Sequence, residues 1–429
     1  MLTVAYLANQ FPVAVEPYVA DEIAELRHRG VQVIAGSVAR MPSDESVPSP
    51  EVVIRPVPAA VLLQAIGLCV RHWNRIAIAI GRVVFKGKEG PIRRAKALLH
   101  TFLGACYAVQ LQSRRVDHIH VHHGFSASWI AMIAARLLGV DWSMTLHGSD
   151  LLLHHAYLDL KLDRCSFCLT VSDYNRRFIL AHCPEVDSGK VLVSRLGVDV
   201  PGFISAVPSA DEHGPFRILA VGRLHAVKDH AFLLRACAQL KTAGFPFRCE
   251  IAGEGPERRR LEALAQRLGV TEVVELLGHS SREQISALYQ RADLVVLTSR
   301  SEGIPLVLME AMARAKLVLA PAITGIPELV TAGKTGFLYE PGSVNDFVQQ
   351  VLAICQFEAN RLPVTHPTVS PAASQVGAVL DWVRHAARVQ VQQNFDRQKN
   401  LESFANLFLG RVAPKLKELP NENLVLQQI

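Results

Sequence analysis

The chain has 429 residues, half of them hydrophobic and 20% charged, so it can form two domains of ordinary size and is not globally disordered. Its eight cysteines show no paired framework, and the single C-x-x-C, Cys165 to Cys168, is weak evidence for a metal or redox site. Reduced thiols and a cytoplasmic protein are expected, with a formal net charge of +6.

The first half of the chain alternates short β-branched runs with helical patterns. Residues 1–9 have no basic region and no small-residue cleavage site, so they predict a β-strand and not a signal peptide. Helices are expected at 17–29 and 127–138. Strands are expected at 4–9, 31–37, 118–123, 142–147, 167–172 and 190–196. This alternation predicts a parallel sheet that is covered on both faces.

A basic and apolar segment precedes the strand at 118–123. The weakly charged run 57–70 has 14 residues, fewer than the roughly 18 to 20 that a membrane-spanning helix needs. Residues 71–96 interleave apolar side chains with eight cations and the single acid Glu89. The cations are Arg71, Arg75, Arg82, Lys86, Lys88, Arg93, Arg94 and Lys96. This pattern favours an amphipathic surface on anionic lipid, or else a helix pair with its cationic side in water.

The strand at 118–123 reads His-Ile-His-Val-His-His. Alternation places His118, His120 and His122 on one face and His123 on the other. Neighbours on one face of a strand lie about 7 Å apart, which is awkward for a zinc ion, so no metal is expected. We expect one histidine at the strand end to act in a ligand site, and His118 and His120 to be structural.

The second half repeats the alternation after a seam at 199–215, which is rich in turn formers. Strands are expected at 216–222, 248–253, 273–278, 294–299, 318–321 and 337–339. Helices are expected at 230–243, 256–268, 282–290 and 305–315. Because open α/β sheets bind ligands at the carboxyl ends of their strands, two such domains predict a cleft between them.

The end of the chain is expected to carry a loop, a long helix and a tail. Residues 361–376 contain three prolines and no periodicity, which predicts an exposed loop. A helical pattern runs from residue 378 to about 409. The predicted domains are therefore 1–205 and 206–376, followed by helices at 377–412 and a tail at 413–429.

Two loops of the second domain suit a phosphate-bearing ligand. Gly222 ends a strand, and Arg223 and Lys228 follow it on a loop. Arginine can grip phosphate oxygens bidentately while lysine supplies a point charge, so the pair suits a diphosphate. A second strand-to-helix turn at 251–256 holds Gly253 and Glu254, where a nucleoside could approach the backbone. A plain tight turn explains that segment equally well.

Residues 299–312 place Glu302 and Glu310 eight positions apart around a helix start. Pro305 suits the first turn of a helix, and Gly303 lets the backbone turn sharply before it. The free amides and the positive dipole end of this helix favour an anion. Two carboxylates flanking an anion seat fit a ligand with hydroxyls on either side of a diphosphate, such as a nucleotide sugar. Two solvated glutamates at a helix start are the alternative.

Taken together, these motifs resemble the retaining nucleotide-sugar glycosyltransferases of family 4, which have the GT-B fold. The matching segments of the second domain are 222–229, 252–256, 302–310, 324–330 and 335–338. The first domain is similar through 116–123, 145–150 and 196–199. Its opening at 9–16 looks most like the branch that builds exopolysaccharides and colanic-acid-type polymers. The resemblance implies an α/β protein of two Rossmann-like domains facing a cleft, with a C-terminal helix crossing back to the first domain.

The resemblance also implies which residues form the donor site. Arg223 and Lys228 would bind the donor diphosphate, and Glu310 would accept hydrogen bonds from the ribose. Glu302 would hold hydroxyls of the transferred sugar. The adjoining backbone and turns would complete the donor pocket through Gly222, Gly253, Glu254, Gly303, Ile304, Pro305 and Leu306.

In the first domain, the resemblance places His122 beside the transferred sugar and His147 along the same cleft. The residues expected to act in catalysis are therefore His122, His147 and Glu302. Residues 10–16 depart from the family, because many relatives carry a Gly-Gly near the end of the first strand. The segment 361–376 also looks like an insertion.

The implied reaction moves a sugar from a UDP- or GDP-linked donor to a hydroxyl of a lipid-linked glycan, with retention of configuration. It would serve bacterial exopolysaccharide, lipopolysaccharide or other cell-surface polysaccharide synthesis. Arg223, Lys228 and the helix at Pro305 would stabilise the leaving diphosphate without a metal or other cofactor. The expected location is the cytoplasm, peripherally on the inner membrane face through 71–96, and no nucleic acid is expected as a partner. The alternatives are a nucleotide-sugar 2-epimerase of the same fold and a non-catalytic partner that binds sugar nucleotides.

Overall fold

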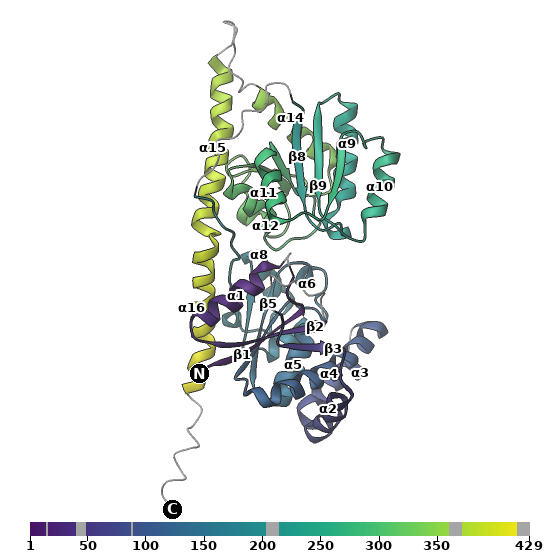
Figure 1. Ribbon diagram of the computed structural model, residues 1–429, viewed down its shortest axis with the longest axis vertical. Helices are drawn as coiled ribbons and strands as arrows, with labels where there is room; N and C mark the ends of the chain where they lie inside the picture. Colours follow the sequence, from purple (N-terminus) through teal and green to yellow (C-terminus); the bar gives the residue numbers. More distant parts are fainter. Residues whose placement is uncertain (14–15, 40–48, 87–88, 203–213, 360–370, 418–429) are drawn as a thin grey trace, which may run out of the picture. The chain divides into compact units, whose positions relative to one another are not determined.

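The computed structural model describes residues 1–13, 16–39, 49–86, 89–202, 214–359 and 371–417. The chain divides into two compact units, each built around one parallel sheet (Figure 1). Unit 1 comprises Met1–Arg195 and Leu401–Ile429, and unit 2 comprises Leu196–Asn400. The division after Arg195 comes ten residues before the boundary predicted after residue 205. Residues 203–213 lie outside the described residues.

Unit 1 contains a seven-stranded sheet in the order β3-β2-β1-β4-β5-β6-β7, with every pair parallel. Its strands are β1 Thr3–Gln10, β2 Gln32–Ala39, β3 Val52–Arg55, β4 His118–His122, β5 Asp141–Leu146, β6 Phe167–Thr170 and β7 Val191–Val193. Strand β3 was not predicted, because four residues before a proline give too short an alternation to detect. The other strands confirm the predicted α/β pattern.

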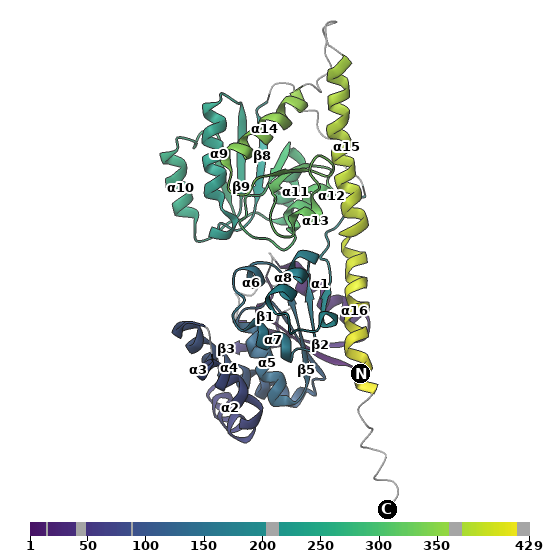
Figure 2. The ribbon, with the colours of Figure 1, turned by 180° about the vertical axis from the view of Figure 1, so that it is seen from behind.

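The helices of unit 1 cover both faces of this sheet (Figure 2). They are α1 Pro17–His28, α2 Ala59–Arg71, α3 Trp73–Phe85, α4 Pro91–Leu111, α5 Ser126–Leu138, α6 Ser149–Leu152, α7 Leu158–Arg164 and α8 Asp173–His182. Helix α5 is buried almost all round, because it packs between α4 and the sheet. Its start is fixed by Asn9, whose Oδ1 accepts hydrogen bonds from the Ser126 hydroxyl at 2.7 Å and the Ala127 amide at 3.1 Å.

The basic segment forms three helices, α2 to α4, rather than the helix pair considered from the sequence. Each buries one apolar stripe against the unit, for example Ile76, Ala79 and Val83 of α3. The same three helices also expose apolar side chains. These exposed residues are Leu63, Ile66, Val70, Trp73, Ile78, Val84, Phe85, Ile92, Leu98 and Leu99.

Unit 2 contains a six-stranded parallel sheet in the order β10-β9-β8-β11-β12-β13. Its strands are β8 Phe216–Val221, β9 Phe247–Ala252, β10 Val274–Gly278, β11 Leu294–Val296, β12 Leu317–Pro321 and β13 Phe337–Tyr339. Its helices are α9 His230–Thr242, α10 Arg258–Arg267, α11 Arg282–Arg291, α12 Leu306–Ala313, α13 Ile326–Leu329, α14 Val344–Ala359 and α15 Pro371–Asn394. In this order β8 neighbours both β9 and β11, so the loops after these three strands lie together at one sheet edge.

The carboxyl-terminal helix is broken in two, at a place where a single helix was predicted. Helix α15 ends at Asn394 and α16 runs over Arg397–Lys417. Between them, Phe395 and Arg397 hydrogen-bond the backbone of Val198 at 2.9 and 3.0 Å, and this pairing competes with the helical ladder. Helix α16 then packs Phe404 and Phe408 into the core of unit 1, as predicted for the C-terminal helix. The prediction that residues 377–412 all pack on the first domain is wrong for α15, which belongs to unit 2 and buries Ala387 and Val391 in its core.

The prediction of a loop over 361–376 is wrong for its last six residues, which belong to α15. Pro371 begins this helix, since its fixed φ and missing amide are tolerated in a first turn, and it therefore starts a helix here instead of extending a loop. Residues 361–370 lie outside the described residues. Among the described residues, every helix is too short or too polar to cross a bilayer.

Candidate functional site

Lys228 and Glu302 form a largely buried ion pair in unit 2, with Nζ 2.6 Å from Oε1. Their loops follow the adjacent strands β8 and β11 and are joined by further bonds. The Thr298 hydroxyl donates to the Lys228 carbonyl at 2.9 Å, and the Arg300 guanidinium pairs with Asp229 at 2.7 Å. The structure therefore brings together Lys228, which was predicted to bind phosphate, and Glu302, which was predicted to bind the sugar.

Helix α12 presents open backbone amides next to this ion pair. Pro305 is the residue before the helix, in extended conformation, and no side chain caps the helix start. Within the described residues, the amides of Gly303, Ile304 and Leu306 donate to no protein group. Thr324 holds the preceding turn, because its hydroxyl donates to the Glu302 carbonyl at 2.6 Å. The start of this eight-residue helix therefore has backbone amides that can bind an anion, as the sequence predicted.

Glu310 lies one turn along α12 and is held by a residue that the sequence did not indicate. The Tyr289 hydroxyl donates to Oε2 of Glu310 at 2.9 Å. Burial raises the pKa of the Glu310 carboxyl, and the hydrogen bond from Tyr289 offsets part of the rise. The Arg314 guanidinium stacks over the Tyr289 ring at 5.2 Å. Tyr289 comes from α11, so only the tertiary fold reveals this contact.

Two glycines of this region are required by close backbone contacts. A Cβ atom on Gly253 would lie 2.0 Å from the Gly222 carbonyl oxygen, and one on Gly325 would lie 1.8 Å from that of Gly303. The turns after β8 and β9 therefore touch each other, as do the turns that precede α12 and α13. Because real Cβ atoms never come so close to a carbonyl oxygen, any side chain here would displace the loops of the site.

Arg223 and Glu254 are exposed, in contrast to the largely buried Lys228–Glu302 pair. The Arg223 side chain is exposed and has no side-chain partner among the described residues. Glu254 is exposed and pairs with Arg258 of α10 at 2.6 Å. Arg258 follows Glu254 by one helical turn and supplies this cation. The role of Glu254 in the donor pocket stays a prediction.

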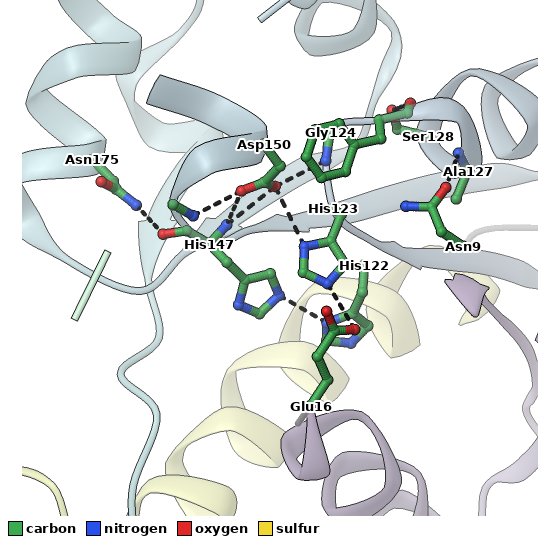
Figure 3. A network of polar contacts seen from close by, with 12 residues as sticks. Asn9, Glu16, His122, His123, Gly124, Ala127, Ser128, His147, Asp150 and Asn175 are labelled. Atoms are coloured by element: carbon green, nitrogen blue, oxygen red, sulfur yellow. Dashed lines mark hydrogen bonds and ion pairs between the residues drawn. The ribbon is translucent and has the colours of Figure 1, made fainter. Parts of the chain in front are cut away.

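In unit 1, His122 and His147 meet at the carboxyl ends of β4 and β5 (Figure 3). Nδ1 of His122 lies 3.1 Å from Nε2 of His147, and Nε2 of His122 lies 3.1 Å from Oε2 of Glu22. The Tyr6 hydroxyl donates to the same carboxylate oxygen at 3.1 Å. Burial lowers the pKa of His147 well below its ordinary value, so this ring is neutral. Glu22 lies on α1, and nothing in the sequence pairs it with the histidine strand.

His118 and His120 contact hydroxyls of the neighbouring strand β5, as expected of structural residues. The Ser143 hydroxyl lies 2.7 Å from His118 Nε2 and 2.7 Å from His120 Nδ1. The other nitrogen of His120 lies 3.0 Å from the Thr145 hydroxyl. Burial lowers the pKa of His120 well below its usual value, so it is a neutral core residue.

Alternation predicted that His123 would lie on the opposite face of the strand from His122, and this prediction is wrong. Its φ of 71° ends the strand and brings its ring to within 4.6 Å of the His147 ring. Burial alone would lower the pKa of His123, but contacts with Asp150 and Glu16 raise it to about 10 (Figure 3). Asp150 also accepts hydrogen bonds from the amides of Gly124 and Gly148 at 2.9 and 2.7 Å. A buried imidazolium thus lies beside the neutral His147.

Glu22, His120 and His122 could together be considered for a metal ion, since each offers a ligand atom within 4.8 Å of the others. The rings of His120 and His122 are 5.2 Å apart, closer than the strand spacing suggested. Their nitrogens are nevertheless already engaged with Ser143, Thr145, Glu22 and His147. A metal would have to displace these bonds, so the geometry favours a hydrogen-bonded network.

Comparison with known proteins agrees with this architecture. Residues 206–361 match the family Glycosyl transferases group 1. The chain is 34% identical over 315 residues to the glycosyltransferase WcaL of Salmonella typhimurium, named for colanic acid biosynthesis, covering 70% of this chain and 72% of that protein. It is 32% identical over 256 residues to WcaL of Escherichia coli, covering 58% of this chain and 61% of that protein.

Solved structures show the same fold at low sequence identity. Sucrose-phosphate synthase from Thermosynechococcus elongatus has a TM-score of 0.72 at 17% identity, covering 96% of this chain and all (100%) of that one. Anabaena HepE in complex with UDP-glucose has a TM-score of 0.67 at 17% identity, covering 98% of this chain and 100% of that one. The two parallel Rossmann-like sheets and these structural neighbours show the GT-B fold. The chain therefore belongs to the group 1 glycosyltransferases, as the family match over unit 2 and the identity to WcaL show.

Proposed function

We propose that this chain is a retaining glycosyltransferase that moves a sugar from a nucleoside diphosphate sugar to a glycan hydroxyl in exopolysaccharide synthesis. The observation that carries the proposal is the Lys228–Glu302 pair beside the open amides of α12, with Glu310 one turn further on. The complex of HepE with UDP-glucose supports a uridine diphosphate donor. The names of the WcaL relatives support a polysaccharide acceptor.

The chemistry follows from where charge develops. As the glycosidic bond breaks, negative charge accumulates on the departing diphosphate oxygen. Lys228 and the amides of Gly303 and Leu306 stabilise this charge, and the exposed Arg223 can turn toward the phosphates. When the diphosphate engages Lys228, the Glu302 carboxylate is released to accept hydrogen bonds from the donor sugar. Front-face attack, with a donor phosphate oxygen taking the acceptor proton, gives retention without a protein nucleophile or a metal.

The acceptor is proposed to be a glycan on a lipid carrier at the inner face of the cytoplasmic membrane. Helices α2 to α4 support this, because they expose Trp73, Phe85 and Ile92 at 55%, 84% and 74%. Large apolar side chains that are exposed next to cations are typical of surfaces that insert into the headgroup region of an anionic bilayer. The cytoplasm is then the compartment in which the nucleotide sugar is supplied.

A donor assay tests this proposal. Purified protein is incubated with UDP- and GDP-sugars, with and without a membrane extract, and free nucleoside diphosphate is measured. Release that depends on the extract, with radiolabel moving into the lipid fraction, is the expected result. Interconversion of two free nucleotide sugars would instead identify a 2-epimerase. Binding of a nucleotide sugar without turnover in any extract would identify a non-catalytic partner, and either outcome would overturn the proposal.

A further inference from the structure

The turn before α13 contains Thr324 and Gly325, and the proposed function gives it no role so far. The Thr324 hydroxyl contacts both backbone groups of Glu302. It donates to the Glu302 carbonyl at 2.6 Å and accepts from the Glu302 amide at 3.3 Å. One side chain of this turn therefore fixes the backbone at the start of the anion-binding segment 302–306.

Gly325 contacts the next carbonyl group of the same segment. A Cβ atom on Gly325 would lie 1.8 Å from the oxygen and 2.9 Å from the carbon of the Gly303 carbonyl. The difference is close to the length of a C=O bond, about 1.23 Å, so this bond points almost straight at Gly325. Only a residue without a side chain can receive the carbonyl at this distance. The carbonyls of Glu302 and Gly303 therefore both face the turn at 324–325.

The direction of these carbonyls fixes the direction of two amides. In a trans peptide, the C=O and N–H bonds point to opposite sides. The Gly303 amide shares its peptide plane with the Glu302 carbonyl, and the Ile304 amide shares its plane with the Gly303 carbonyl, so both amides point away from the turn. Gly303 and Ile304 are buried, and neither amide has an acceptor within the part of the chain that the structure describes. Buried amides without a partner are rare in folded proteins, so this pair indicates a ligand.

Thr324 holds this arrangement in an unfavourable backbone conformation. Its φ of 45° lies in the left-handed region, which β-branched residues rarely adopt. A glycine would adopt the same φ without strain. Such strain persists only where the surrounding structure compensates for it, and it is concentrated at functional sites. The compensation here is the pair of hydrogen bonds to Glu302, which a glycine cannot make.

We infer that Thr324 and Gly325 are positioning residues, which orient the amides of Gly303 and Ile304 toward the diphosphate of the donor. This inference rests on the proposed function for its ligand. Residues 303 and 304 precede α12, so the hydrogen bonds of that helix do not orient their amides. Because the charge on the leaving diphosphate is greatest as the glycosidic bond breaks, misdirected amides should lower both the affinity for UDP and the rate.

Three substitutions of Thr324 in the full chain separate orientation from folding. Thr324→Val removes the hydroxyl, and Thr324→Gly removes the hydroxyl and the strain together. In both variants the dissociation constant for UDP, measured by calorimetry, should rise at least about tenfold, and kcat should fall. Thr324→Ser keeps the hydroxyl and should bind UDP and turn over nearly as the parent chain does. Thr324→Gly should also melt at a higher temperature than Thr324→Val, so its weaker binding cannot be ascribed to lower stability.

Thr335→Val is the matched control, because the Thr335 hydroxyl also contacts two backbone groups of a turn in unit 2. It accepts from the Thr331 amide at 2.9 Å and donates to the Leu329 carbonyl at 3.4 Å. This variant should bind UDP as the parent chain does. Unchanged affinity for UDP in Thr324→Gly, or equal losses in Thr324→Ser and Thr324→Val, would overturn the inference. A parent chain that binds UDP but transfers no sugar would overturn the proposed function alone, because UDP binding by the Thr324 variants still tests the role of the turn.

Discussion

The Glu310 carboxylate is mostly buried and accepts one hydrogen bond from the described residues, which leaves it able to accept others from a ligand. The Tyr289 hydroxyl occupies Oε2 at 2.9 Å, and burial raises the pKa of the acid. A desolvated carboxylate gains more from a ligand hydroxyl than an exposed one does, because water no longer competes for it. This physical property matches the proposed contact with the ribose.

Glu310→Gln should lower kcat/KM for the donor at least about tenfold, which corresponds to about 1.4 kcal/mol of transition-state stabilisation. The amide keeps the shape and can still accept the Tyr289 hydrogen bond, so the free energy of unfolding should change little. Steady-state kinetics and urea denaturation measure the two effects. Glu262→Gln, on the exposed face of α10, is a matched control. Full activity in Glu310→Gln would remove this residue from the donor site.

At the scale of elements, helices α2 to α4 carry two apolar faces where a globular domain needs one. On α2, Leu63, Ile66 and Val70 are exposed at 73%, 51% and 73%, while Ala65 and Leu68 are buried. The cations of these helices serve different purposes. Arg75 donates to the Leu137 carbonyl at 2.9 Å and Arg82 pairs with Asp159 at 3.0 Å, so both contribute to packing within unit 1.

Membrane binding should therefore be tested with the exposed cations Arg71, Arg93 and Lys96. Changing all three to Glu should release the protein from vesicles that contain phosphatidylglycerol, because each cation near an anionic surface contributes roughly 1 kcal/mol. Phe85→Ser should weaken binding to the same vesicles at high salt, where the apolar contribution remains. Sedimentation with vesicles is the measurement. Neutral phosphatidylcholine vesicles are the control for charge. Unchanged binding of the triple variant to the anionic vesicles would contradict the proposal that α2 to α4 bind lipid.

At the scale of the whole molecule, each unit has its own core, and unit 1 contains a buried charge cluster of Glu16, His123 and Asp150 beside the carboxyl end of β4. The pKa of His123 is raised from 6.5 to about 10 in the folded chain. A raised folded pKa means that the native state holds the proton more tightly than the unfolded chain does. The stabilisation is complete below about pH 6.5 and is lost as the pH rises through about 10.

The free energy of unfolding of unit 1 should therefore fall between about pH 7 and 9, and His123→Gln should make this dependence shallower. Both buried tryptophans, Trp129 and Trp142, lie in unit 1, so their fluorescence during urea unfolding reports mainly on that unit. His28→Gln, at the exposed end of α1, is the control. An unchanged pH dependence in His123→Gln would show that this histidine does not hold its proton in the native state.

The sequence alone determined the two parallel sheets, the turns after β8 and β11, and the placement of Glu302 and Glu310 around a helix start. These features follow from local patterns, because alternation, glycine and proline act within a few residues. It did not reveal the contact between Glu22 and His122 or the hydrogen bond from Tyr289 to Glu310. It also did not reveal that His123 turns toward His147, or that the C-terminal helix breaks between α15 and α16. Each of these depends on a contact between segments that are distant in the chain. Only the packed fold decides which polar groups share a buried space, and that burial decides their charge.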